Sequence, residues 1–196
     1  MRITGGQARG RRLLGPKSDQ YFLRPTCDRV REALFNILGK KVFGAVALDL
    51  FAGTGAWGIE ALSRGAAAVL FVYESLEAGR LVAANIKNCM PQSQAGFVRL
   101  RLNASSQLTF LGGKVPAPHL FDLVFLDPPY QKHLAESLLK VVEEAHILAP
   151  GALVIAEEHH STVLPARIGS LQSVDNRQYG ESRLWFFTAN SQPTGT

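Results

Sequence analysis

An aspartate, two prolines and a tyrosine follow directly after one apolar stretch of the chain. They are Asp127, Pro128, Pro129 and Tyr130, after residues 121–126. The stretch has the length and the Val, Leu and Phe content of one strand, and prolines end a strand because they donate no hydrogen bond to a sheet. Asp127 and the Pro128 carbonyl can accept hydrogen bonds from a planar amino group, and a base can stack on the Tyr130 ring. The four residues indicate amino-group chemistry, with an ordinary strand-ending turn as the alternative.

A glycine-rich turn carries the second chemical signal. Gly53, Gly55 and Gly58 have the Gly-x-Gly-x-x-Gly spacing and follow an expected strand that ends near Asp49. Glycines let the chain turn sharply and let a ligand approach the backbone. The spacing fits a nicotinamide dinucleotide as well as an adenosyl cofactor, and Glu74 could hold ribose hydroxyls in either, or be a solvated acid. Because the Asp-Pro-Pro-Tyr corner indicates a reacting amino group rather than hydride transfer, methyl transfer is the preferred interpretation.

The elements that must position these residues alternate between strand and helix. We expect strands at 45–50, 68–73, 97–102, 121–126, 152–157 and 183–188. We expect helices at 26–39, 56–64, 76–89, 105–111 and 135–147. This alternation predicts a three-layer α/β fold with a mostly parallel sheet. Ligands bind such sheets at the carboxyl ends of the strands, which is where both motifs lie.

Length and composition predict one main globular core. The chain has 196 residues, of which 46% are hydrophobic, and no apolar run approaches the length that spans a bilayer. The first residues lack the apolar core of a signal peptide, so we expect a cytoplasmic protein without a membrane partner. Cys27 and Cys89 form no Cys-x-x-Cys pair and the histidines show no metal-ligand spacing, so no metal is expected.

Positive charge is concentrated in the N-terminal segment. Residues 1–41 carry ten basic and three acidic side chains, whereas the rest of the chain carries eleven and thirteen. Arginines spaced by glycines can follow a phosphate backbone, although a solvated or partly frayed basic terminus is the alternative. The candidate RNA-contacting residues are Arg9, Arg11, Arg12, Arg24, Arg29 and Arg31. Of these, Arg29 could instead pair with Glu32 along a helix.

The motifs together resemble one bacterial family, the small-subunit (16S) ribosomal RNA guanine-N2 methyltransferases. The resemblance extends over residues 2–12, 23–36, 48–55 and 60–65, and over Asn85, the Asp-Pro-Pro-Tyr corner, Tyr179 and Gly180. It implies a Rossmann-like class I methyltransferase whose mostly parallel, seven-stranded sheet has helices on both faces and a reversed last strand. It also implies S-adenosylmethionine as cofactor, S-adenosylhomocysteine as product and an RNA guanine as acceptor.

The resemblance assigns roles to individual residues. The expected catalytic residues are Asp127, Pro128 and Tyr130. The expected cofactor-binding residues are Asp49, Phe51, Gly53, Gly55, Glu74, Asn103 and Asp127. Two positions depart from the family: Asn103 stands where an aspartate is usual, and Tyr73 precedes the acid where apolar residues are usual. An Asn103 carbonyl can still accept a hydrogen bond from the adenine amino group, but without the help of a charge.

The function expected from the sequence is methyl transfer to the exocyclic N2 amino group of a guanine. The acceptor would be small-subunit ribosomal RNA or the assembling small subunit, and the protein a monomer. Residues 1–41 would form an RNA-contacting arm and helix, 42–190 the methyltransferase domain and 191–196 a disordered tail. The alternatives are a DNA adenine or cytosine amino methyltransferase and a non-catalytic RNA-binding protein of ribosome assembly.

Overall fold

A computed structural model of the chain describes residues 1–16, 26–100, 120–128 and 134–189. The chain divides into two compact units, Met1–Arg101 and Leu102–Thr196. The expected helix at 105–111 lies outside the described residues, as does the expected tail at 191–196. Within the described ranges, no helix is both long and apolar enough to cross a membrane.

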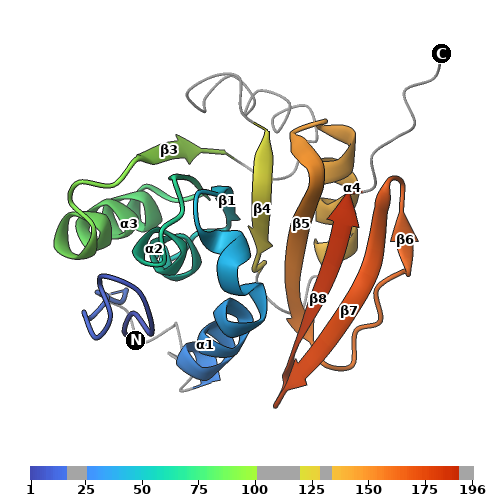
Figure 1. The fold of residues 1–196 in the computed structure, drawn as a ribbon, viewed down its shortest axis with the longest axis horizontal. Helices are drawn as coiled ribbons and strands as arrows, with labels where there is room; N and C mark the ends of the chain where they lie inside the picture. The colour runs from blue at the N-terminus through green and yellow to red at the C-terminus, as the bar shows by residue number, and fades with distance from the viewer. Residues whose placement is uncertain (17–25, 101–119, 129–133, 190–196) are drawn as a thin grey trace. The chain divides into compact units, whose positions relative to one another are not determined.

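The first unit alternates helices with parallel strands (Figure 1). Its elements are α1 (Thr26–Leu38), the 3-10 helix η1 (Gly39–Val42), β1 (Val46–Leu50), α2 (Ala56–Ser63), β2 (Ala68–Tyr73), α3 (Leu76–Cys89) and β3 (Ala95–Arg99). Strand β2 pairs in parallel with β1 on one side and with β3 on the other. The apolar side chains of β1 and β2 are almost entirely buried, as expected for strands covered by helices on a parallel sheet.

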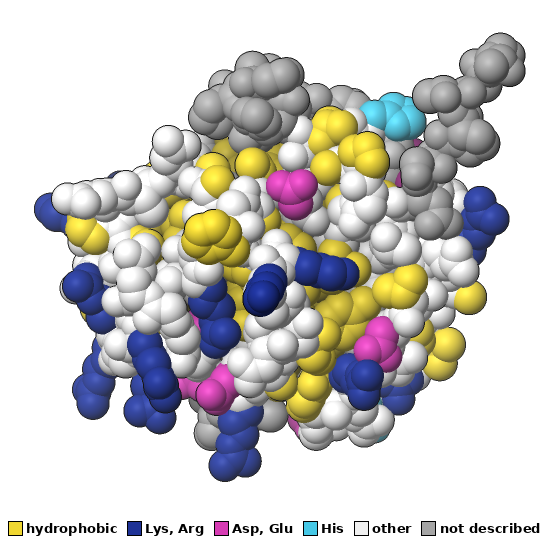
Figure 2. Space-filling view, viewed as in Figure 1, with side chains coloured by type: hydrophobic (Ala, Val, Ile, Leu, Met, Phe, Trp, Pro, Cys, Tyr) yellow, Lys and Arg dark blue, Asp and Glu magenta, His cyan; other side chains and the backbone are white. Residues whose placement is uncertain are grey.

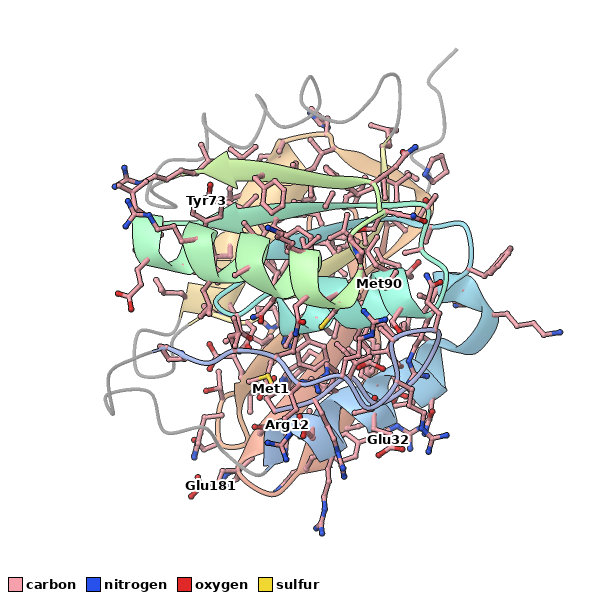
Figure 3. The ribbon with its side chains drawn as sticks, turned by 90° about the vertical axis from the view of Figure 1, so that its left-hand side faces the viewer. Met1, Arg12, Glu32, Tyr73, Met90 and Glu181 are labelled. Carbon is pink, nitrogen blue, oxygen red and sulfur yellow. The ribbon has the colours of Figure 1, made fainter. Side chains whose placement is uncertain are left out.

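The basic N-terminal arm, residues 1–14, is a hairpin that docks on α2 and α3. Arg2 and Arg12 form an antiparallel bridge, and Figure 3 shows Met1 and Arg12 close together on this segment. Ile3 is buried on the inner side of the hairpin. The turn at Gly6 fits only a glycine, because its φ is +75° and a Cβ there would lie 1.8 Å from the Ser63 carbonyl oxygen. The arm is therefore a built part of the first unit, rather than a frayed terminus.

One buried carboxylate joins the arm to two helices. Glu60 on α2 is fully buried and accepts hydrogen bonds from Thr4 N (2.8 Å) and Thr4 Oγ1 (2.7 Å) of the arm. Its other partners are Arg31 Nε of α1 at 3.2 Å and Arg64 Nε at 2.8 Å. Arg31 also donates to Asp28 Oδ1 (2.8 Å) and to the Arg2 carbonyl. A buried charge needs such partners, so the arm, α1 and α2 depend on one another.

The second unit places antiparallel strands beside a parallel pair. Its elements are β4 (Phe121–Leu126), α4 (Leu134–Glu144), β5 (Leu148–His159), β6 (Arg167–Ile168), β7 (Leu171–Tyr179) and β8 (Ser182–Ala189). Strands β4 and β5 are parallel, whereas β8 runs antiparallel to both β5 and β7, and β6 pairs with β7. The reversed last strand is thus confirmed. The described residues hold one strand more than the resemblance implied, and the short β6 accounts for it.

The expected elements largely agree with those observed. The strands at 68–73 and 121–126 and the helix at 76–89 have the predicted bounds. The third strand starts two residues earlier than expected, at Ala95, and β5 extends beyond the expected 152–157 at both ends. β7 was not predicted, because its sequence is mostly polar and its order comes from pairing with β8.

Replacing Glu60 by alanine should destabilise the first unit strongly. The change removes the buried partner of Arg31 and leaves it only the partly exposed Asp28, and breaking a buried ion pair typically costs about 3–5 kcal/mol. The free energy of unfolding from urea titration measures the effect. Glu136→Ala is the matched control, because Glu136 pairs with Lys140 at 2.7 Å on an exposed helix face and such pairs contribute about 0–1 kcal/mol. Equal losses in the two variants would contradict the structural role of Glu60.

Candidate active site

The loop between β1 and α2 has a strained backbone. Phe51 has a φ of +63°, which is unusual for a residue with a side chain, and Gly53 and Gly55 have φ values of +52° and +78°. The loop is fixed by hydrogen bonds from Ala52 N to Val72 O (3.0 Å) and from Gly55 N to Ala52 O (2.5 Å). Strained backbone of this kind is characteristic of ligand-binding turns.

The three glycines of the motif serve different purposes. A Cβ at Gly58 would lie 2.3 Å from the Phe71 ring, so this glycine allows α2 to pack against β2. A Cβ at Gly55 would lie 3.1 Å from Val82 of α3. At Gly53, by contrast, a Cβ would meet only the Phe51 carbonyl oxygen, at 3.7 Å, among the described residues. Gly53 is the position of the motif at which the backbone stays open to a ligand.

Asp49 lies at the end of β1, directly before this loop. Its carboxylate is fully buried, and Oδ2 accepts a hydrogen bond from Gly58 N at 2.9 Å. Among the described residues, Oδ1 has no hydrogen-bond partner. Burial raises the pKa of Asp49 from 3.8 to about 7, although the Gly58 N–H partly opposes this increase. The charged form of Asp49 is therefore poorly stabilised by the chain itself, and a cation bound at the loop would favour it.

Glu74 follows β2 and is exposed. Leu50 pairs with Val72, so the carboxyl ends of β1 and β2 lie at the same edge of the sheet. The preceding residue, Tyr73, turns its ring toward α3, where a Cβ on Gly79 would lie 2.4 Å from it. The tyrosine is thus accommodated by a glycine on the neighbouring helix, and Glu74 keeps its place at the edge, where a ligand for ribose hydroxyls is expected.

In the second unit, Asp127 and Pro128 follow β4 directly. Pro128 is buried and Asp127 is partly exposed. The parallel register pairs Leu126 with Ala156 of β5, so the next residue along each strand is Asp127 on one and Glu157 on the other. Glu157 is only 9% exposed. The register of β4 with β5 thus places a second carboxylate beside the Asp-Pro corner, which sequence reasoning did not identify. Tyr130 and Asn103 lie outside the described residues.

The candidate RNA-contacting arginines fall into distinct groups. Arg9, Arg12 and Arg29 are exposed, and Lys and Arg side chains gather over the first unit in Figure 2. Arg11 is exposed too, but its guanidinium donates to the Asn88 and Cys89 carbonyls at the end of α3. Arg24 is outside the described residues.

The assignment of Arg31 to RNA binding needs correction. Arg31 is 1% exposed, and its guanidinium is bonded to Glu60, Asp28 and the Arg2 carbonyl. The side chain is committed to holding the arm on α1 and α2, so it has no surface left for a phosphate. A sequence alone gives no sign of this, because the partner Glu60 is 29 residues away.

Sequence reasoning also missed the role of Asn85. This residue of α3 is fully buried, and its amide bonds to both the arm and the glycine loop. An asparagine in the middle of a helix, surrounded by apolar residues, is the signal that could have revealed it. Within the described ranges, no group of three or more His, Cys, Asp or Glu side chains could hold a metal ion.

Comparison with known proteins places the chain in a family. The sequence model of the family described as "Conserved hypothetical protein 95" matches residues 1–188. "Ribosomal RNA small subunit methyltransferase D" of Escherichia coli (strain K12) is 41% identical over 165 residues, which cover 84% of this chain and 78% of that protein. The chain belongs to this family. "Putative rRNA methyltransferase YlbH" of Bacillus subtilis (strain 168) is 33% identical over 92% of this chain and 94% of that protein.

Solved structures agree with the family assignment. The structure described as "Putative methyltransferase yhhF from Escherichia coli" has a TM-score of 0.80 and 33% identity, and covers 98% of this chain and 99% of that one. A structure from Haemophilus influenzae, described as a "putative methylase", has a TM-score of 0.74 and 30% identity over 97% and 98%. These likenesses confirm the class I methyltransferase fold and the resemblance inferred from the motifs.

The buried Asp49 should make the stability of this family member pH-dependent. The folded chain keeps a proton on Asp49 that the unfolded chain releases above about pH 4, so the free energy of unfolding falls as the pH rises from about 4 to about 7. Asp49→Asn removes this pH-dependent decrease in the free energy of unfolding, because asparagine does not titrate. In thermal or urea unfolding without cofactor, the stability of the variant relative to wild type should increase by about 2–3 kcal/mol between pH 5 and pH 8.

The exposed Glu77 of α3 supplies the control for net charge. Glu77→Gln removes one negative charge from the same unit. A similar change in its pH profile would contradict the assignment to Asp49.

Proposed function

We propose that this protein transfers a methyl group from S-adenosylmethionine to the exocyclic N2 amino group of a guanine in small-subunit ribosomal RNA. The observation that carries the proposal is the Asp127–Pro128 corner at the end of β4 in a chain of the small-subunit methyltransferase family. Two acceptor groups at a strand end suit an amino group as reacting partner. DNA amino methylation and non-catalytic binding lose support, because the named relatives are rRNA methyltransferases.

The loop after β1 fits a cationic adenosyl cofactor. Gly53 leaves the backbone open, and the nearby buried Asp49, whose Oδ1 no described residue partners, would be favoured in its ionised form by a cation bound at the loop. A similar fold occurs in a Salinibacter ruber RNA methyltransferase solved with S-adenosyl-L-homocysteine, with a TM-score of 0.62 and 16% identity. The residues that would hold the cofactor are Asp49, Phe51, Gly53, Gly55, Glu74, Asn103 and Asp127. The cofactor supplies a methyl group that its sulfonium already activates.

The chain's own residues would mainly orient the acceptor. The guanine amino nitrogen is a weak nucleophile because its lone pair is delocalised into the ring, so alignment dominates the rate. Asp127 and the Pro128 carbonyl would accept hydrogen bonds from the amino group and hold its lone pair toward the methyl group, with Tyr130 stacking on the base. After transfer, the nitrogen loses a proton readily, and Asp127 or water can receive it.

Glu157 would favour guanine over adenine. The edge of guanine that carries the amino group presents N1–H and N2–H as neighbouring donors, whereas adenine presents an acceptor at N1. Two carboxylates on neighbouring strands match the two donors of guanine. The base must be unpaired to reach such a corner, at a cost of a few kcal/mol that is smallest in an RNA loop.

Labelled methyl transfer tests the reaction directly. Small ribosomal subunits that lack guanine-N2 methylation are incubated with methyl-labelled S-adenosylmethionine and digested to nucleosides. Wild type should yield N2-methylguanosine, and Asp127→Ala should slow the reaction by about 100-fold or more, because orientation of the amino group is lost. The dissociation constant for S-adenosylhomocysteine should rise by much less than turnover falls, because the other proposed cofactor-binding residues remain in place. Label in adenine or cytosine would overturn the acceptor assignment, and unchanged turnover in the variant would remove Asp127 from the mechanism.

The same methyl-transfer assay tests whether Glu157 contributes to the reaction, with Glu158 as the comparison. Glu157→Gln should reduce turnover by about 10- to 100-fold, the usual effect of losing a charged hydrogen bond. Glu158→Gln is the matched control, because successive strand residues point to opposite faces. The Glu158 carboxylate accepts from His159 N (3.2 Å) and Thr162 Oγ1 (3.4 Å), so it is held within its own turn. Equal losses would argue that Glu157 is structural.

We expect the RNA phosphates to be contacted by Arg9 and Arg12 of the arm, together with Arg11, Arg24 and Arg29. Replacing Arg9 and Arg12 by alanine should weaken RNA binding and reduce the slope of log K against log salt by about 1.5, as expected for two lost phosphate contacts. Filter binding at several salt concentrations measures the slope. The pair Arg167→Ala and Arg177→Ala removes equal charge from exposed strands of the second unit. If both pairs alter the slope equally, the effect is one of net charge rather than of the arm.

We propose that the protein acts in the cytoplasm, with small-subunit ribosomal RNA or the assembling subunit as its partner. We propose that it acts as a monomer. The division into residues 1–41, 42–190 and 191–196 remains a prediction, and in the structure the arm and α1 belong to the same compact unit as β1 to β3.

A further inference from the structure

The strongest unassigned feature of the first unit is the amide of Asn85. This side chain is fully buried and bonds to two segments that are 40 residues apart in sequence. On the arm, Asn85 Oδ1 accepts from Leu14 N at 2.7 Å and Nδ2 donates to Leu14 O at 3.1 Å. On the glycine loop, Nδ2 donates to Thr54 O at 2.9 Å. One amide group thus serves both the N-terminal arm and the loop.

The contact on the loop fixes one peptide group. Thr54 O is held by Asn85, and the N–H of the same peptide, that of Gly55, donates to Ala52 O. This peptide joins Thr54 to Gly55, and the left-handed conformations of Gly53 and Gly55 on either side of Thr54 shape the open side of the loop. The orientation of the peptide therefore affects the surface at which a ligand approaches Gly53. Met1 Sδ also accepts from Thr54 Oγ1 at 3.7 Å, which is a second contact from arm to loop.

The contact with Leu14 on the arm makes the bond between Asn85 and Thr54 depend on whether the arm is docked. If the arm leaves α2 and α3, Asn85 loses the two hydrogen bonds to Leu14 and keeps the one to Thr54 O. An amide held by one hydrogen bond is less firmly oriented than one held by three, so the side chain can turn and release Thr54. The orientation of the Thr54–Gly55 peptide in the loop then changes when the arm undocks.

We propose that Asn85 is a positioning residue that makes cofactor binding at the glycine loop depend on docking of the N-terminal arm. The proposal rests on the proposed function, since the cofactor is the adenosyl cofactor assigned there. By linkage, a ligand at the loop must strengthen docking of the arm by the same factor. The arm also carries the exposed Arg9 and Arg12, so its position is open to influence by bound RNA.

Two glycines of the arm provide a matched pair of perturbations. Gly6 and Gly10 both have positive φ, +75° and +84°, so alanine is strained at either position. A Cβ at Gly6 would lie 1.8 Å from Ser63 O, whereas a Cβ at Gly10 meets no described atom within 4 Å. Gly6→Ala therefore displaces the arm from α2 without touching Asn85 or the loop. Gly10→Ala introduces similar strain but leaves docking possible.

Calorimetric titration of the full chain with S-adenosylhomocysteine tests the dependence. Gly6→Ala and Asn85→Ala should each raise the dissociation constant by about 5- to 30-fold, the range expected for one or two lost buried hydrogen bonds. Gly10→Ala should stay within about threefold. In the Asn85→Ala background, Gly6→Ala should add less than about twofold, because the connection is already broken. Asn88→Ala is the second control. Its side chain donates to Arg12 O of the arm at 3.2 Å, but this bond is exposed to solvent, so its loss should leave the arm docked and the dissociation constant within about threefold.

The outcomes separate this proposal from the proposed function. If wild type does not bind S-adenosylhomocysteine, the proposed function fails and the inference falls with it. If wild type binds and the effects of Gly6→Ala and Asn85→Ala multiply, or Gly6→Ala has no effect, the inference alone is overturned.

A measurement on the wild type avoids the risk that a variant misfolds. Saturating S-adenosylhomocysteine should slow hydrogen exchange of the Leu14 amide by about fivefold or more, because this N–H donates to Asn85. Unchanged exchange at Leu14 would overturn the proposal.

Discussion

The first unit depends on the neutralisation of one buried charge, that of Glu60. Glu60 belongs to α2 and its carboxylate has no exposed surface. Burying this charge is energetically acceptable only while Thr4, Arg31 and Arg64 donate hydrogen bonds to it. These donors come from the arm, from α1 and from the end of α2. The N-terminal basic segment is thereby divided: some arginines point inward to complete the fold, and others remain on the surface for a partner. Net charge alone could not have made that distinction.

Unfavourable features of the first unit gather around the loop after β1. Phe51 adopts a left-handed conformation, and the neighbouring Asp49 is buried with one oxygen that no described residue partners. Both features cost stability in the chain without a ligand, and the surrounding packed strands hold them in place. A cation bound at the loop would favour the ionised form of Asp49. A cationic ligand bound there would recover part of this cost, which is the usual relation between stability and binding at a functional site.

The sequence predicted the elements that local patterns specify. Strand β2, strand β4 and helix α3 follow from apolar runs and helical spacing, and the family follows from motifs of adjacent residues. It could not predict features that depend on distant partners. The buried state of Arg31 requires Glu60, the order of β7 requires pairing with β8, and the position of Glu157 beside Asp127 requires the register of β4 with β5. Each of these is set by tertiary pairing, which no local pattern encodes.

The energy of the hydrogen bonds that one amide makes limits how strongly Asn85 can connect the arm with the loop. Loss of its partners costs roughly 1–3 kcal/mol, whereas moving a two-state equilibrium from 1:99 to 99:1 needs about 5.5 kcal/mol. The connection between arm and loop therefore adjusts the affinity of the loop over a limited range and cannot act as an on-off switch. A graded effect suits a protein whose arm is already held by bonds within the chain to Glu60 and Ser63. RNA that contacts the exposed arginines would then reinforce an existing arrangement, and the gain at the loop would be modest but always of the same sign.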